Sequence, residues 1–222
     1  MQGRLCAEEF SEILLLCGNG YGVAALRLVR GMFERTVTTR YLSEHPDAVD
    51  NYLDYYWISQ HRLMGAIRET FGPGVFGDDK EEEMEQHFQN VKAKFMVTDC
   101  KKCDTKRLNH TWSKLDFVAM ARATGELGKL IVPAYYLPTK EIHSTIGAVL
   151  SRLDGDAEGL VFEGGGQHKR ADEALISAHN LILNCLKLQE TYFQLDILKR
   201  SLEACYADFF EIWGSPKTVP GQ

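Results

Sequence analysis

Apolar side chains recur every three or four residues along most of this chain. Between residues 23 and 42 the series is Leu26, Val29, Phe33, Val37 and Tyr41, which fits the 3.6-residue period of an α-helix. A second such stripe runs through residues 84–95. Similar patterns, bounded by Pro or Gly, predict helices over residues 5–17, 47–70, 114–124 and 139–152. The pattern therefore predicts an all-α fold, a bundle of about seven or eight helices.

The last part of the pattern, residues 170–213, contains no Pro and no Gly. A continuous helix of this length would extend for about 66 Å. A compact domain of the size of this chain is only about 45 Å across. Two interpretations remain open: the segment is two helices joined at a kink, or a long C-terminal helix projects and packs against a second copy of the chain.

No internal repeat and no shift in composition divides the chain. We therefore expect a single helical domain over residues 1–222, with a core over about 5–152, a flexible glycine-rich loop over 154–167 and the long terminal helix over about 170–213. Leu160-Val-Phe is the one short β-like run, and the glycines around it make it a poor strand. The polar stretch over residues 98–113 is expected to be irregular.

Composition and charge narrow the functional classes. The chain has 31 acidic and 25 basic residues, a formal charge of −6, so no global field attracts nucleic acid. Its apolar content of 45% is enough to fill a core, which excludes a disordered or fibrous protein. No apolar run reaches the roughly 18 residues of a membrane-spanning helix, and no signal-peptide pattern opens the chain. Six Cys are too few for a disulfide scaffold and indicate a cytoplasmic location.

Cys100-Lys-Lys-Cys103, with His110 seven positions later, is the pattern most typical of a metal site. Two thiolates and an imidazole are zinc ligands, but a structural zinc site needs four ligands, and the sequence has no second Cys pair. A surface loop is therefore favoured over zinc, and no cofactor is predicted. Residues 154–159 begin like a calcium loop, yet Gly165 stands where the bidentate Glu of such a loop belongs.

Arg30 and Glu34 lie beside the apolar stripe of residues 26–37 rather than opposite to it, and Tyr41 follows near the same face. A charged pair at the edge of a core needs hydrogen-bond partners, because an unpaired buried charge is costly. One interpretation is an i, i+4 salt bridge that fixes the helix. The other is a polar pocket for catalysis or for a small ligand, with Arg62 and His143 as further members.

Several short elements in a fixed order resemble a known family pattern. They are Leu28-x-Arg30-x-x-x-Glu34 with Tyr41 and Pro46, then Trp112-Ser113, Met120-Ala-Arg-Ala-Thr-Gly125, Tyr135-Tyr136 and Thr139-x-x-x-His143. This order, over roughly residues 20–150, is similar to that of a bacterial all-helical family catalogued as a domain of unknown function. The resemblance implies a helical bundle in which Arg30, Glu34, Tyr41 and His143 converge, and it implies no reaction.

Two functions of different classes remain open. The first is a non-catalytic cytoplasmic module that forms a homo-oligomer through its C-terminal helix, where Tyr192, Phe210 and Trp213 need to be buried. The second is a hydrolase or nuclease of a defence or stress system. In that enzyme His143 would act as general base held by Glu34, and Arg30 or Arg62 would bind an anion.

The partners that the sequence indicates are few. The acidic residues concentrate near residues 78–85 and 154–163, which leaves Arg27 and Arg30 in a less acidic part of the chain. A small anionic ligand is compatible with that distribution. Neither a membrane nor nucleic acid is indicated as a partner.

Overall fold

The computed structural model describes residues 2–100, 105–143, 146–150, 152–156, 159–162, 166 and 168–214, without the side chains of Cys100, Asp154, Asp156 and Lys169. The described chain is predominantly helical, which confirms the all-α prediction. None of its helices combines the length and the apolar character needed to cross a membrane. The chain forms two compact units, which we call unit 1 (residues 1–43 with 117–222) and unit 2 (residues 44–116).

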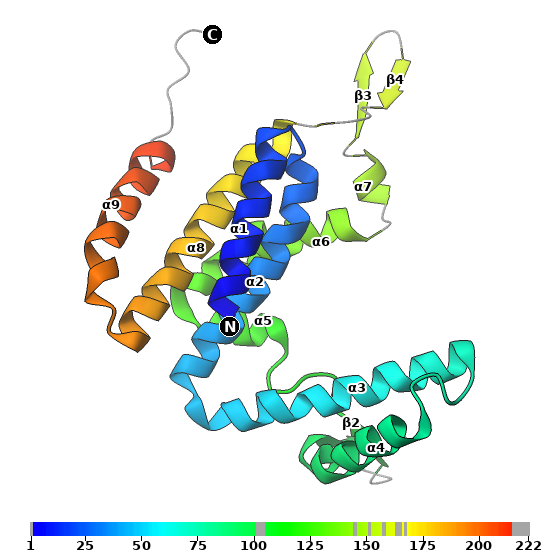
Figure 1. Ribbon diagram of the computed structural model, residues 1–222. Coiled ribbons are helices and arrows are strands. Elements are labelled where there is room, and N and C mark those ends of the chain that lie inside the picture. The colour runs from blue at the N-terminus through cyan, green and yellow to red at the C-terminus, as the bar shows by residue number, and fades with distance from the viewer. Residues whose placement is uncertain are drawn as a thin grey trace, which may run out of the picture. The chain divides into compact units, whose positions relative to one another are not determined.

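Three long helices form the centre of unit 1: α1 (Gln2–Gly18), α2 (Gly22–Glu44) and α8 (Ala171–Phe193). Helix α8 packs along α1, and Figure 1 shows α2 beside them. The predicted stripe of α2 is buried, since Leu26, Val29, Phe33 and Val37 are each at most 1% exposed. The ring of Phe33 packs edge-on against Phe117, with 5.8 Å between the centroids, at the start of α5 (Phe117–Ala123). The helical period thus predicted correctly which face of α2 enters the core.

A tight turn at Gly20 joins α1 to α2. The φ angle of Gly20 is +82°, in the left-handed region that favours glycine. The N–H of Tyr21 donates to the carbonyl of Leu16 at 2.8 Å and closes the turn. Gly22 then begins α2 directly against the start of α8, where a Cβ would lie 2.3 Å from the backbone nitrogen of Ala171. The absence of a side chain at Gly22 lets the two helix starts come this close.

The segment between α5 and the second hairpin is broken into short helices: η3 (Gly125–Leu130), η4 (Val132–Tyr136), α6 (Leu137–Ile142) and α7 (Ile146–Leu150). Of these, η4 is a π-helical turn that directly precedes α6 and its Pro138. Proline has no N–H for the helical hydrogen bonds, so a change of helix type beside it is expected. The predicted continuous helix over 139–152 is wrong, because α6 ends at Ile142 and His143 is extended, with φ −85° and ψ 147°.

The C-terminal segment consists of two helices. Helix α8 ends at Phe193, Gln194 adopts a left-handed φ of 54°, and α9 (Asp196–Trp213) folds back against α8. The inner stripe of α9 is Leu198, Leu202, Tyr206, Phe209 and Trp213, of which Leu202 is buried and the others are half-buried. The two-helix interpretation of residues 170–213 is therefore correct, and the continuous long helix is not formed. Its length no longer argues for a second copy of the chain.

Two antiparallel hairpins interrupt the helical pattern. Strand β1 (Met96–Cys100) pairs with β2 (Thr105–Leu108), and β3 (Leu153–Asp156) pairs with β4 (Gly159–Phe162). The expectation of an irregular 98–113 was therefore wrong for the residues of β1 and β2 and is confirmed for residues 109–113, while the expectation of no strand at 160–162 was wrong. All four residues of β4 are exposed. A strand without a buried face does not need alternating apolar and polar residues, so its sequence does not identify it as a strand. The rest of the predicted loop over 154–167 lies partly outside the described residues.

Unit 2 is built on the helical hairpin of α3 (Val49–Phe71) and α4 (Asp78–Lys92), with η1 (Pro46–Ala48) before it and η2 (Ala93–Phe95) after it. Its core joins Ile58 of α3 to Phe88, Val91 and Phe95, so the stripe over 84–95 is confirmed from Phe88 onward. At the other end of the hairpin Arg68 donates to Glu81 Oε2 from Nε at 3.0 Å and from Nη2 at 2.6 Å.

Candidate functional site

Arg30 and Glu34 form the predicted salt bridge within α2. Arg30 Nε donates to Glu34 Oε1 at 2.9 Å, and the guanidinium lies 4.7 Å from the centre of the Tyr135 ring in η4. The two side chains are 22% and 41% exposed. A pair this hydrated stabilises a protein by at most about 1 kcal/mol. Arg30 is thus engaged in joining α2 to η4, and the catalytic role of Glu34 stays a prediction.

Arg62 belongs to unit 2, where its guanidinium bonds within the protein. Its Nη1 donates to Tyr55 Oη at 2.8 Å and its Nη2 to the carbonyl of Asn109 at 2.7 Å. Tyr55 Oη donates to the same carbonyl at 3.1 Å. These bonds hold the segment after β2 against α3. Tyr41 is half-buried near the end of α2, and a ligand-binding role for Arg62 or Tyr41 stays a prediction.

The three residues considered as zinc ligands, where a surface loop was favoured over a metal site, lie mostly beyond the described residues. Cys103 and the side chain of Cys100 are outside them, while His110 is exposed. The backbone N–H of His110 donates to Asn109 Oδ1 at 2.9 Å. Within the part of the chain that the structure describes, no three His, Cys, Asp or Glu side chains gather where they could hold a metal ion.

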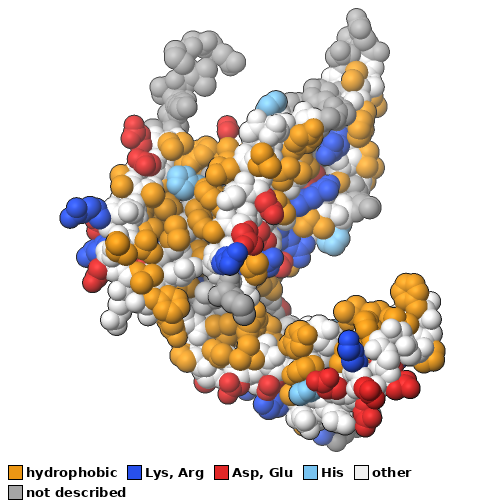
Figure 2. Space-filling model, viewed as in Figure 1, with side chains coloured by type: hydrophobic (Ala, Val, Ile, Leu, Met, Phe, Trp, Pro, Cys, Tyr) orange, Lys and Arg blue, Asp and Glu red, His pale blue; other side chains and the backbone are white. Residues whose placement is uncertain are grey.

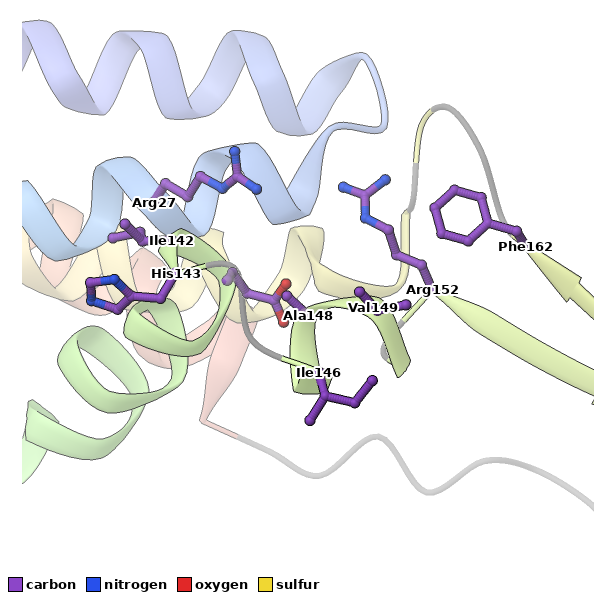
Figure 3. A pocket seen from close by; sticks show the side chains of 9 residues that line it. Arg27, Ile142, His143, Ile146, Ala148, Val149, Arg152 and Phe162 are labelled. Carbon is purple, nitrogen blue, oxygen red and sulfur yellow. The ribbon is translucent and has the colours of Figure 1, made fainter.

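His143 lies at a pocket of about 490 Å³ in unit 1. The pocket is lined from α2, α6, α7, β4 and the residue before β3: Arg27, Glu141, Ile142, His143, Ile146, Ala148, Val149, Arg152 and Phe162. Figure 3 shows the guanidinium of Arg27 reaching toward that of Arg152, with Phe162 beyond Arg152 and His143 at the other end. Neither Glu34 nor Arg30 is among the lining residues, so the predicted members of the site are only partly brought together.

The charges around this pocket are unbalanced. Glu141 is 5% exposed, and its Oε1 lies 3.8 Å from Arg170 Nη2, while the Nη1 of Arg170 lies 3.1 Å from Glu173 Oε2. In the described part of the chain neither Arg27 nor Arg152 forms an ion pair. Glu141 thus has a cation of its own, and among the side chains that the structure describes no carboxylate pairs with the guanidinium of Arg27 or of Arg152.

The sequence did not predict Arg152 as a residue of the pocket. For Arg27, one feature of the sequence pointed to such a role. No Asp or Glu stands three or four residues from Arg27 in either direction, so it has no partner within its own helix. Arg152 is 125 positions further along the chain. The periodicity did not reveal that α6 ends at Ile142, so nothing in the sequence was a reason to expect both arginines at one pocket.

A second cluster in unit 1 surrounds His179 of α8. Its ring centroid lies 6.4 Å from that of Phe10 in α1 and 5.1 Å from that of Phe209 in α9. Trp213 Nε1 donates to His179 Nδ1 at 3.4 Å, which requires a neutral imidazole. Burial lowers the pKa of His179 below its usual value, against an opposing effect of Asp208. His179 therefore acts as a neutral, structural link between the outer helices, a role the sequence did not suggest.

The described thiols are free, and most of them fill the core. Cys6, Cys17 and Cys185 are buried among apolar helical neighbours, whereas Cys205 is exposed on α9 although its sequence neighbours are apolar as well. The thiol of Cys185 raises the pKa of Cys6, and burial raises it further. A thiol held protonated in this way packs as an apolar group and is a poor nucleophile.

Comparison with known proteins gives a family without an assigned reaction. Residues 4–160 match the model of a family described as a family of unknown function, DUF5677. No curated protein and no solved structure matches the chain. The matched region contains Arg27, the Arg30–Glu34 pair, His143 and Arg152, and it ends before α8 and α9.

Proposed function

The protein belongs to DUF5677, a family of unknown function, and on that premise we propose that it is a non-catalytic helical module that associates with a second copy of itself through the α8–α9 hairpin. Its free thiols suit the reducing cytoplasm, where we place it. The proposal is carried by the apolar side chains that this hairpin exposes.

Exposed apolar residues gather at the turn of the hairpin, and two more lie near the C-terminal end of α9. Tyr192 is 67% exposed, Phe193 62% and Ile197 85%, and Phe210 and Ile212 are exposed near the C-terminal end of α9. Figure 2 shows hydrophobic side chains over this part of unit 1. Monomeric proteins seldom leave several large apolar side chains together in water, and such patches mark interaction sites.

The charges beside these residues suit a second copy of the same surface. Asp196, Lys199, Arg200 and Glu203 stand next to Ile197 in the first turns of α9, with both signs present. In a two-fold dimer the same patch meets itself, so each acidic residue can face a basic residue of the other copy. A patch of one sign would repel itself instead.

The hydrolase or nuclease alternative is the weaker proposal. In the predicted mechanism a carboxylate orients the ring of His143 for general-base catalysis. Glu34 bonds to Arg30, and Glu141, the carboxylate at the pocket of His143, lies near Arg170. Assays of His143→Ala against phosphodiester and ester substrates would restore this alternative if they detected activity in the parent protein that the variant lacks.

Sedimentation velocity over a range of micromolar concentrations tests self-association. We expect a dimer for the parent protein and a monomer for a variant with Phe193→Asp and Ile197→Asp. Truncating a hot-spot residue weakens association by at least about 30-fold. The matched control is Phe71→Asp, which places the same charge on an exposed aromatic position of α3 and is expected to leave the dimer intact. A monomeric parent protein, or a dimer in the double variant, would overturn the proposal.

A further inference from the structure

We infer that the pocket between Arg27 and Arg152 binds a small organic phosphate monoester. The phosphate would lie between the two guanidiniums, and the organic part would lie against the apolar residues of α6, α7 and β4. This inference does not depend on self-association, because the pocket and the α8–α9 hairpin share no residue.

The first argument is the charge of the pocket. Two guanidiniums from α2 and from the residue before β3 reach toward each other across it, as Figure 3 shows. Like charges repel, and the described carboxylate at the pocket, Glu141, lies 3.8 Å from Arg170 Nη2. An anion between Arg27 and Arg152 would relieve that repulsion and accept hydrogen bonds from both side chains.

The second argument concerns the number of charges on the ligand. One guanidinium can satisfy a carboxylate by a bidentate pair, so a site with two arginines that pair with no described carboxylate provides more positive charge than one carboxylate needs. A phosphate monoester carries between one and two negative charges at neutral pH and has three terminal oxygens, which two arginines can share. His143 lies at the same pocket and adds a further donor.

The third argument is the apolar part of the wall. Ile142, Ile146, Val149 and Phe162 line the pocket and are all exposed in the structure. Inorganic phosphate alone would leave them in water. An aromatic or aliphatic group attached to the phosphate would cover them, and a volume of about 490 Å³ lies in the range of pockets for small organic ligands.

Isothermal titration calorimetry with phenyl phosphate at low ionic strength tests the inference. We expect the parent protein to bind phenyl phosphate more tightly than benzoate and more tightly than inorganic phosphate. Arg27→Gln and Arg152→Gln should each weaken binding by about 10-fold or more, since each removes charge-assisted hydrogen bonds. Ile146→Ala should weaken the binding of phenyl phosphate and leave that of inorganic phosphate unchanged.

The matched control is Arg122→Gln, which removes an exposed arginine from α5 of the same unit without touching the pocket. Arg27 is exposed and Arg152 half-buried, so thermal unfolding without ligand should show folded variants. Absence of binding to the parent protein, or equal loss in Arg122→Gln, would overturn the site. Benzoate binding as tightly as phenyl phosphate would overturn the choice of phosphate. Equal binding of inorganic phosphate would overturn the role of the apolar wall.

Discussion

Gly22 shows how a single residue decides whether two helices can meet. Its missing Cβ would lie 2.3 Å from the nitrogen of Ala171 and 2.5 Å from the carbonyl carbon of Arg170. Both neighbours are backbone atoms, which cannot rotate away as the end of a flexible side chain can. The contact fixes the start of α2 against the start of α8.

We therefore expect Gly22→Ala to lower the free energy of unfolding, by about 1 to 3 kcal/mol as for other overpacked sites. Gly65→Ala is the matched control, because Gly65 lies inside α3 with nothing within 4 Å of an added Cβ. Alanine is the better helix former by about 1 kcal/mol, so that variant should be stabilised. Urea denaturation followed by circular dichroism measures both. A stabilised Gly22→Ala would show that the helix starts can separate without cost.

At the scale of elements, a helix boundary could be predicted from the sequence where a Gly or a Pro stands at it. Gly20 and Pro46 are such residues, and the helix ends beside them were predicted correctly. Gln194 is neither, although it adopts the left-handed conformation between α8 and α9. The periodicity of apolar residues continues across it, so no pattern distinguished a turn from a continuous helix. The exposed strand β4 was missed for a related reason, since an unburied strand has no apolar face to detect.

The α3–α4 hairpin of unit 2 should depend on pH through Glu81. Its hydrogen bonds from Arg68 hold the pKa of Glu81 below the usual value near 4.5. The folded state therefore favours the charged form of Glu81. The contribution of the Glu81–Arg68 pair to the free energy of unfolding is present above the usual pKa and is lost as the pH falls through the lowered pKa. We expect Glu81→Gln to reduce the urea midpoint at about pH 7 and to reduce it progressively less as the pH falls through the lowered pKa.

The control for this experiment is Glu69→Gln, an exposed carboxylate on α3. It should change the midpoint little over the same pH range, because a hydrated carboxylate of this kind contributes little to stability. An effect of Glu81→Gln that was equally large in acid would assign the loss to packing of the side chain rather than to the ion pair.

At the scale of the whole molecule, each unit has its own buried core, which the composition could not reveal. The cluster of Ile58, Phe88, Val91 and Phe95 draws on α3, α4 and η2, all within unit 2. The prediction of a single domain over residues 1–222 rested on the absence of a linker or a composition shift. Unit 2 lies in the sequence between α2 and α5 without a linker or a composition shift at either end. Unfolding experiments can decide whether the two units unfold as one domain.

Phe88→Ala addresses that question. The side chain is 3% exposed, and removing it should cost unit 2 about 3 to 5 kcal/mol. Trp57 and Trp112 report on unit 2 and Trp213 on unit 1, so variants that retain only one set of tryptophans separate the signals. We expect the substitution to shift the unit 2 transition in urea and to leave that of Trp213 in place. Coincident shifts of both signals would show one cooperative domain.

The π-helical turn η4 has a consequence for how relatives of this protein should be compared. Such a turn accommodates one residue more than an α-helical turn, and each residue rotates a helix by about 100°. A homologue one residue shorter between Val132 and Tyr136 would close this turn as an ordinary α-helical turn, so α6 would keep its orientation and Glu141 and Ile142 would keep their positions at the pocket. A one-residue deletion at this turn would thus spare the pocket, whereas the same deletion within α6 would rotate the side chains after it away from the pocket.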